Sequence, residues 1–345
     1  MSTRSHCLCR WPLRIVVLLA VTTMALCAWA QSVDEVHVTP SPKAAEEPGS
    51  QSLHPVAARE ALHLRPKPLR HDVDLVLVPV TVTDSYNRLV TGLEQKDFSL
   101  KEDGSRQEIQ YFSTEDGPIS LGVILDVSKS MSNKIDDARD AVRQFLESAN
   151  PQDDCFVITF SDAPELLADT TRSVGFVRER LATIVPSGRT ALLDAIYLGL
   201  TKMHRAKHGR RALLVISDGG DNNSRYTERE LKKMVEEADV EIYAIGIFER
   251  LLKVLAPPEE LDGKRLLTAV TEASGGRLFI LRNPRELPQI AAEVSLELRN
   301  QYVLGYRPGN QARDGKWRPI EVSLATADGR RLRVHAKKGY TAAGE

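Results

Sequence analysis

The hydrophobic positions of this 345-residue chain change their spacing twice. Near both ends of the sequence, apolar and polar residues alternate in short runs, which is typical of strands that bury one face. These runs lie at 75–84, 98–102, 109–112, 301–306, 319–325 and 331–336. Three short strands at each end would form two marginal sheets on their own. We therefore predict that both ends pair with each other in one small antiparallel β-sandwich.

Between these ends the pattern becomes one of continuous apolar runs separated by longer amphipathic stretches. The apolar runs lie at 121–126, 155–160, 212–218, 240–247 and 276–281. The stretches with apolar residues three and four apart lie at 135–148, 174–185, 191–204, 228–239 and 266–275. A strand that is apolar throughout is covered on both faces, and helices supply that cover. The pattern predicts an α/β fold with a doubly wound, mostly parallel sheet.

The first 70 residues differ from the rest. Arg4, Arg10 and Arg14 precede an apolar run that closes on Ala-Trp-Ala at residue 30, which is typical of a signal peptide over 1–30. An uncleaved anchor is the alternative, but the run is shorter than the ~20 apolar residues of a membrane span. Residues 31–70 are rich in Pro, Glu and Ser without a hydrophobic period, so we predict a disordered linker.

These boundaries give a domain plan for an exported protein, periplasmic or extracellular. An N-terminal β segment (71–115), a central domain (120–298) and a C-terminal β segment (300–341) follow the linker. After cleavage Cys155 is the remaining cysteine, so no intrachain disulfide is possible. The formal net charge of −1 gives no field that would attract nucleic acid, and a membrane contact is expected only through an uncleaved signal.

Oxygen-bearing side chains follow the apolar run at 121–126. Its last residue is Asp126, and Ser128 and Ser130 follow at every second position. On extended backbone, residues two apart point to the same side, so these three side chains are expected to converge. In open α/β sheets, ligands bind beyond the carboxyl ends of the strands, which is where this group falls.

Two further loops are expected to reach the same point. Thr190 follows a Gly-Arg turn at the start of a predicted helix, and Ser217 and Asp218 end the 212–218 strand. A cluster of oxygens with no Lys or Arg head group nearby needs a cation or a set of hydrogen-bond donors to satisfy it. A hard divalent ion fits best.

These motifs together resemble the von Willebrand factor type A domain. An Asp-x-Ser-x-Ser run after a first strand, a later Thr and a Ser-Asp-Gly after a fourth strand occur in the family's order across about half of the chain. The flanks, which include Val80–Asp84, Asp97–Gly104, Gln301–Tyr306 and Gly315–Val322, resemble those of bacterial secreted proteins of this class.

The resemblance implies a Rossmann-like fold and a metal-ion-dependent adhesion site. It assigns Mg²⁺, with Mn²⁺ or Ca²⁺ as alternatives, to the residues Asp126, Ser128, Ser130, Thr190 and Asp218. It also implies a binding module rather than an enzyme, whose partner is a protein that presents an acidic side chain to the ion. The departures are a short Ser187-Gly188-Arg189 lead-in to Thr190 and an extra carboxylate at Asp221.

Other interpretations of these residues stay open at this point. Ser128 and Ser130 also suit the capping of a following helix. Asp126 suits a phosphoryl-accepting aspartate, which would make the protein an enzyme, and an envelope structural protein with a non-functional metal site is a third class. His204 and His208 are four residues apart, a spacing that suits Zn²⁺, but a solvated helix end explains them better.

Overall fold

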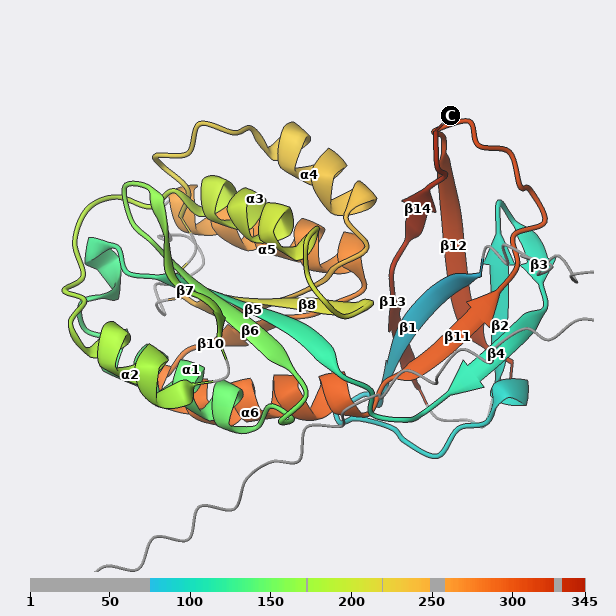
Figure 1. Cartoon of the computed structure of the whole chain (residues 1–345), viewed down its shortest axis with the longest axis horizontal. Helices are drawn as coiled ribbons and strands as arrows, with labels where there is room; N and C mark the ends of the chain where they lie inside the picture. The colour runs from blue at the N-terminus through green and yellow to red at the C-terminus, as the bar shows by residue number, and fades with distance from the viewer. Residues whose placement is uncertain (1–74, 172, 219, 249–257, 326–330, 345) are drawn as a thin grey trace, which may run out of the picture. The chain divides into compact units, whose positions relative to one another are not determined.

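The computed structural model describes residues 75–171, 173–218, 220–248, 258–325 and 331–344 (Figure 1). These residues form one six-stranded sheet and two four-stranded sheets. The predicted signal peptide (1–30) and linker (31–70) lie outside the described residues. Among the helices that the structure describes, none combines the length and the apolar character of a membrane span.

The six-stranded sheet forms the centre of the α/β part. Its strands, in spatial order, are β10 (Leu278–Leu281), β9 (Glu241–Ile247), β8 (Arg210–Ser217), β5 (Ile119–Asp126), β6 (Asp154–Phe160) and β7 (Pro164–Thr171). All neighbours are parallel except β6 and β7, which are antiparallel. Strand β5 is buried at every position because it has strands on both sides and helices over both faces. The prediction of a mostly parallel, doubly wound sheet is confirmed.

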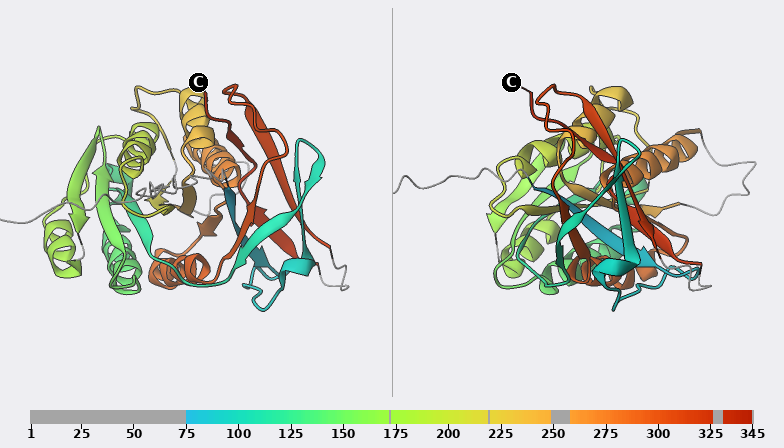
Figure 2. Two further views of the ribbon diagram at one scale, coloured as in Figure 1. Left: turned by 45° about the vertical axis from the view of Figure 1, so that its right-hand side comes forward. Right: turned by 90° about the vertical axis from the view of Figure 1, so that its right-hand side faces the viewer.

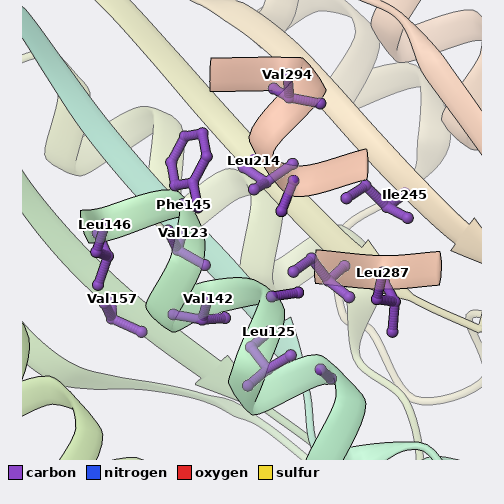
Figure 3. Packing of buried hydrophobic residues seen from close by; sticks show 14 of the residues in the cluster. Val123, Leu125, Val142, Phe145, Leu146, Val157, Leu214, Ile245, Leu287 and Val294 are labelled. Atoms are coloured by element: carbon purple, nitrogen blue, oxygen red, sulfur yellow. The ribbon is translucent and has the colours of Figure 1, made fainter. Parts of the chain in front are cut away.

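Helices cover both faces of this sheet (Figures 1 and 2). Their bounds are α1 (Ile135–Glu147), α2 (Val174–Ala182), α3 (Leu192–Met203), α4 (Glu228–Glu237), α5 (Pro258–Ser274) and α6 (Leu287–Arg299), with short 3-10 turns η1 (Gln95–Asp97), η2 (Lys129–Met131) and η3 (Pro284–Glu286). Helices α1, α2 and α6 share one hydrophobic cluster with the sheet, and α3, α4 and α5 share another. Figure 3 shows the first cluster, in which Val142 and Phe145 of α1 pack beside Val123 and Leu125.

The two small sheets join the ends of the described chain. One has the order β13 (Arg333–Ala336), β1 (Val76–Thr83), β11 (Tyr302–Tyr306), β4 (Ile109–Ser113), and the other β14 (Gly339–Thr341), β12 (Trp317–Leu324), β2 (Phe98–Glu102), β3 (Ser105–Gln107). Each sheet combines strands from both ends of the sequence, which alternate in the first sheet and meet at the β12–β2 pair in the second. They share one core, in which Val80, Phe98, Leu100 and Tyr302 are buried. The predicted pairing of the two flanking segments is therefore confirmed.

Two elements of the α/β part were not predicted from the sequence. Strand β7 is an antiparallel edge strand that follows β6 through a short turn, so it lacks the continuous apolar run of a central strand. Helix α6 begins with a proline in its first turn, where the missing N–H costs nothing. Its buried residues Leu287, Ala291, Val294 and Leu298 pack in the cluster that includes α1.

Candidate metal centre

Three loops meet beyond the carboxyl ends of β5 and β8. The backbone N–H of Lys129 donates to the carbonyl of Gly188 (3.2 Å), and that of Ser187 donates to the carbonyl of Val127 (3.0 Å). Gly188 has a φ of +81°, a conformation that L side chains rarely adopt. The turn before Thr190 is thus bound directly to the loop after β5, although it lacks a longer glycine-rich lead-in.

Asp126 lies at the bottom of this group and has no exposed surface. Its Oδ1 accepts a hydrogen bond from the Ser128 N–H (2.9 Å), and its Oδ2 accepts one from the Ser217 hydroxyl (2.6 Å). Burial, together with the nearby Asp218 carboxylate, raises the pKa of Asp126 to about 6, although the bonds from Ser128 and Ser217 act in the opposite direction. Two carboxylates close together in a buried place require a cation to balance them.

A chain of hydrogen bonds continues from Ser128 to the second carboxylate. The hydroxyls of Ser128 and Ser130 are 3.0 Å apart, and the Ser130 hydroxyl donates to Asp218 Oδ1 (2.9 Å). The side chains therefore meet as predicted, but not for the predicted reason. Ser128 is extended (φ −66°, ψ 168°), whereas Ser130 lies in the 3-10 turn η2. The tight turn, and not continued alternation, brings the second hydroxyl back toward the first.

Thr190 is held in place by its backbone. Its N–H donates to the Asn222 side-chain oxygen (3.0 Å), and its carbonyl accepts from the N–H groups of Asn222 and Asn223 (3.0 and 3.1 Å). The residue is buried, with 5% of its surface exposed. Within the described part of the chain, no hydrogen bond joins its hydroxyl to the other four predicted ligands. The structure thus fixes the Thr190 loop against the β8 loop and links the remaining four residues directly.

Asp221, the extra carboxylate, serves a different element. Its Oδ1 accepts hydrogen bonds from the N–H groups of Leu192 (2.8 Å) and Leu193 (3.3 Å) and from the Ser224 hydroxyl (2.5 Å). It therefore satisfies the free backbone donors at the start of α3. These contacts hold Asp221 at the start of α3, whereas Asp218 is joined to Ser130.

The sequence led us to expect no cationic head group near these oxygens. The position of Lys134 shows that this expectation is wrong. Its Nζ is 3.0 Å from Asp218 Oδ2, and the two side chains are only 5% and 9% exposed. Lys134 immediately precedes α1, and it is 84 residues away from Asp218 in sequence. No local sequence pattern predicts this contact, because a lysine before a helix usually extends into solvent.

The alternative roles of the other candidates can be compared with their contacts. Ser128 precedes the turn η2 but its side chain makes no capping hydrogen bond there, so capping does not explain it. The ring of His208 is 3.1 Å from the carbonyl of Gln152 and 3.7 Å from Asp154, at the opposite ends of the strands from Asp126. Cys155 is partly buried, and burial raises the pKa of its thiol to about 11, which suits a small core residue.

The donor set fits a hard divalent cation. It consists of two carboxylates and three hydroxyl groups, all oxygen, and hydroxyls and carboxylates are ligands that Mg²⁺ accepts, commonly with water completing the shell. No group of three or more His, Cys, Asp or Glu side chains suited to a metal occurs in the described ranges. A metal here would depend on the hydroxyls as much as on Asp126 and Asp218.

Comparison with known proteins finds a family match in the central part of the chain. A family model described as the von Willebrand factor type A domain matches residues 121–220. Similar solved structures include BatB from Bacteroides thetaiotaomicron, with 16% identity and a TM-score of 0.42 over 52% of this chain and 98% of that chain. A von Willebrand factor type A protein from Catenulispora acidiphila has 13% identity and a TM-score of 0.44 over 76% and 73% of the two chains.

A third similar structure is proximal thread matrix protein 1 from the mussel byssus, described with a zinc-occupied MIDAS motif. It has 16% identity and a TM-score of 0.45 over 57% of this chain and 49% of that chain. No curated protein matches the chain.

Proposed function

Since this chain contains a von Willebrand factor type A domain, which is often a protein-binding module, we propose that it captures a partner protein through a metal ion. The ion is Mg²⁺, or Mn²⁺ or Ca²⁺ in its place, and the partner contributes an acidic side chain. The residues that would hold the ion are the five at the ends of β5 and β8 and in the loop before α3, namely Asp126, Ser128, Ser130, Thr190 and Asp218. When bound, the ion supplies an open coordination position that a carboxylate can occupy.

One observation carries this proposal. The carboxylates of Asp126 and Asp218 are near enough to raise the pKa of Asp126, and the hydroxyls of Ser128 and Ser130 bridge between them at 3.0 and 2.9 Å. Burying two like charges beside each other is unfavourable without compensating cations, and Lys134 beside Asp218 supplies one positive charge against the two carboxylates. Because Ser130 and the rim of these loops are exposed, an ion held there is accessible to a partner.

The surface around the centre favours an anionic visitor. Lys129, Arg189 and Arg225 lie on the three loops of the site and are exposed, although Arg225 also pairs with Asp194 (3.4 Å). Their positive field attracts acidic groups and raises the rate of encounter, although salt screens it. The aromatic ring of Tyr226, which stacks on Tyr197 with centroids 3.8 Å apart, adds an exposed apolar contact beside Arg225.

The geometry gives less support to a phosphoryl-transfer enzyme. A nucleophilic aspartate needs an oxygen open to the phosphorus atom. Both oxygens of Asp126 accept hydrogen bonds, and the residue has no exposed surface. Hydrolysis of a generic phosphate ester by the wild type, lost in Asp126→Asn, would favour the enzyme over the binding module.

Export is part of the proposal. The signal-like residues 1–30 would direct the chain out of the cytoplasm, and the 31–70 linker would then separate the binding domain from the export signal. Mass spectrometry of the mature protein, expected to begin after Ala30, tests this arrangement.

The central experiment compares ion binding in Asp126→Asn and wild type. Removing one charge without changing the side-chain shape should lower Mn²⁺ affinity more than about tenfold, because a carboxylate ligand is lost. Isothermal titration of the chelator-treated full chain measures this affinity. Asp136→Asn is the matched control, since that carboxylate lies nearby at the start of α1 but is 90% exposed.

Equal Mn²⁺ affinity in Asp126→Asn and wild type would remove the metal centre. If the ion binds as expected, capture of partner proteins with and without chelator then tests the function itself. Partner capture that is insensitive to chelator would support the structural protein with a non-functional metal site instead.

A further inference from the structure

Resting on the proposed function, we propose that Lys134 is a built-in counter-ion of the metal centre. It compensates the Asp218 carboxylate when no divalent ion is bound, it weakens the binding of that ion, and it keeps the ion-loaded centre net positive. Lys134 is thus a positioning and specificity-determining residue for an anionic partner, although it is not itself one of the predicted ligands.

The contact is direct and buried. Lys134 Nζ lies 3.0 Å from Asp218 Oδ2, while the other oxygen of that carboxylate accepts the Ser130 hydroxyl at 2.9 Å. The lysine side chain is only 5% exposed. A buried ammonium group is costly unless it is paired, so a lysine at this place is explained by the carboxylate that it meets.

The balance of formal charges shows what the lysine changes. In their ionised forms Asp126 and Asp218 contribute −2 and Lys134 contributes +1, so the centre carries −1 without a divalent ion and +1 with one. Without the lysine the corresponding values are −2 and 0. The lysine therefore reduces repulsion between the carboxylates in the ion-free state, opposes the entry of a second cation, and leaves a positive charge for an acidic ligand.

Burial distinguishes Lys134 from the cations at the rim. Lys129, Arg189 and Arg225 are exposed, so water and salt screen their effect on the centre. Lys134 acts from inside the protein, where the effective dielectric constant is lower and a charge has a larger influence. Its contact also ties the start of α1 to the end of β8, which is a purely structural role that the experiment must separate.

The test replaces Lys134 with methionine, which keeps the length of the side chain and removes its charge. After treatment with chelator, the full chain is titrated with Mn²⁺ alone. We expect Lys134→Met to bind Mn²⁺ about tenfold more tightly than wild type, because a competing buried cation is gone. The melting temperature of the ion-free variant should be lower than that of ion-free wild type. The rise in melting temperature on adding Mn²⁺ should be larger for the variant than for wild type.

Further variants make the result specific to the buried charge. Lys233→Met is the matched control, since this lysine also lies near a carboxylate, Glu237 (3.9 Å), but is 77% exposed on α4, and its Mn²⁺ affinity should stay close to that of wild type. Lys134→Arg keeps the charge and should also remain close to wild type. Lys134→Gln, which can still donate a hydrogen bond to Asp218, replaces the methionine variant if that variant does not fold.

The outcomes separate this inference from the proposed function. Mn²⁺ binding by wild type, with equal or weaker affinity in the uncharged variants, overturns the role of Lys134 and leaves the metal centre intact. A loss of stability without any gain in Mn²⁺ affinity assigns the lysine a structural role only. Absence of Mn²⁺ binding by wild type overturns the proposed function, and the inference with it.

Discussion

Asp218 and Asp221 are three residues apart after the same strand, yet their contacts differ. Asp218 meets Ser130 and Lys134, whereas Asp221 accepts hydrogen bonds from the backbone at the start of α3. Their places in sequence alone cannot separate them, because either carboxylate follows β8 closely enough to reach the loop after β5. The difference lies in their partners, because Asp218 reaches the residues ahead of α1 and Asp221 reaches the first backbone N–H groups of α3.

This difference predicts opposite behaviour of the two alanine variants. Asp221→Ala should lower the free energy of unfolding by about 1–2 kcal/mol, because the first N–H groups of α3 lose their acceptor. Its rise in melting temperature on adding Mn²⁺ should remain. Asp218→Ala should lose that rise, and thermal unfolding with and without Mn²⁺ measures both. A lost Mn²⁺ response in Asp221→Ala would place that carboxylate in the metal centre.

At this scale the sequence predicted the oxygen-bearing residues better than their surroundings. The Asp126, Ser128 and Ser130 run is local, so its place at the end of a buried strand could be predicted, whereas the 3-10 turn that brings Ser130 back toward Ser128 could not. The pairing of Lys134 with Asp218 spans 84 residues and depends on the way α1 packs against the sheet. A contact of that kind has no periodicity, and only the folded chain reveals it.

At the scale of elements, β1 shows how the flanking segments depend on each other. It lies between β11 and β13, pairing antiparallel with both, and neither neighbour comes from its own end of the chain. In the other sheet, β12 pairs with β2. An isolated pair of strands is marginal in water, so each segment needs the other to bury its apolar face.

Removing all residues from Gln301 to the end of the chain tests this dependence. Because β1 would lose both hydrogen-bonded neighbours, its amides should lose their protection against hydrogen exchange, while those of β5 and β8 keep most of theirs. Hydrogen exchange followed by mass spectrometry compares the truncated chain with the full chain. Protection of 76–83 that survives truncation would show that the N-terminal strands fold without the C-terminal ones.

The predicted and unpredicted elements differ in the kind of signal that they carry. The strands β5, β8 and β9 are continuous apolar runs because both of their faces are covered. Edge strand β7 has Glu165 and Asp169 exposed among its apolar residues, so it resembles a loop when continuous hydrophobicity is the criterion. Pairing with β6 defines this strand, and its own composition does not.

At the scale of the whole molecule, buried polar contacts connect the sandwich with the central sheet. The amide nitrogen of Gln301 donates to Glu241 (2.5 Å) and lies within 3.3 Å of the Tyr243 hydroxyl and 3.4 Å of the Thr81 hydroxyl. Near this junction, His335 of β13 lies 3.1 Å from the Thr83 hydroxyl. Glu241 and His335 are titratable, so the stability of the junction between the sandwich and the central sheet should depend on pH.

Two groups at the junction respond to pH in opposite directions. Burial raises the pKa of Glu241 from 4.5 to about 7, although the bond from Gln301 partly offsets this effect. The folded state therefore binds more protons than the unfolded state between these values, and stability falls as pH rises from 4.5 to 7. Burial, with the positive charges of Arg277, Arg333 and Lys338, lowers the pKa of His335 from 6.5 to about 4, so stability falls as pH drops through that window.

In the wild type these two dependences overlap and largely cancel, so single variants are needed to separate them. Relative to wild type, the free energy of unfolding of Glu241→Gln should rise with pH between 4.5 and 7, and that of His335→Gln should rise as pH falls from 6.5 to 4. Each slope is at most about 1.4 kcal/mol per pH unit, and urea unfolding across this range measures it. Titration of the distant Asp126 is common to all three proteins and cancels in the differences. Slopes of opposite sign would show that the folded protein raises the pKa of Glu241 and lowers that of His335. Differences that are independent of pH in both variants would show that neither group is perturbed at the junction.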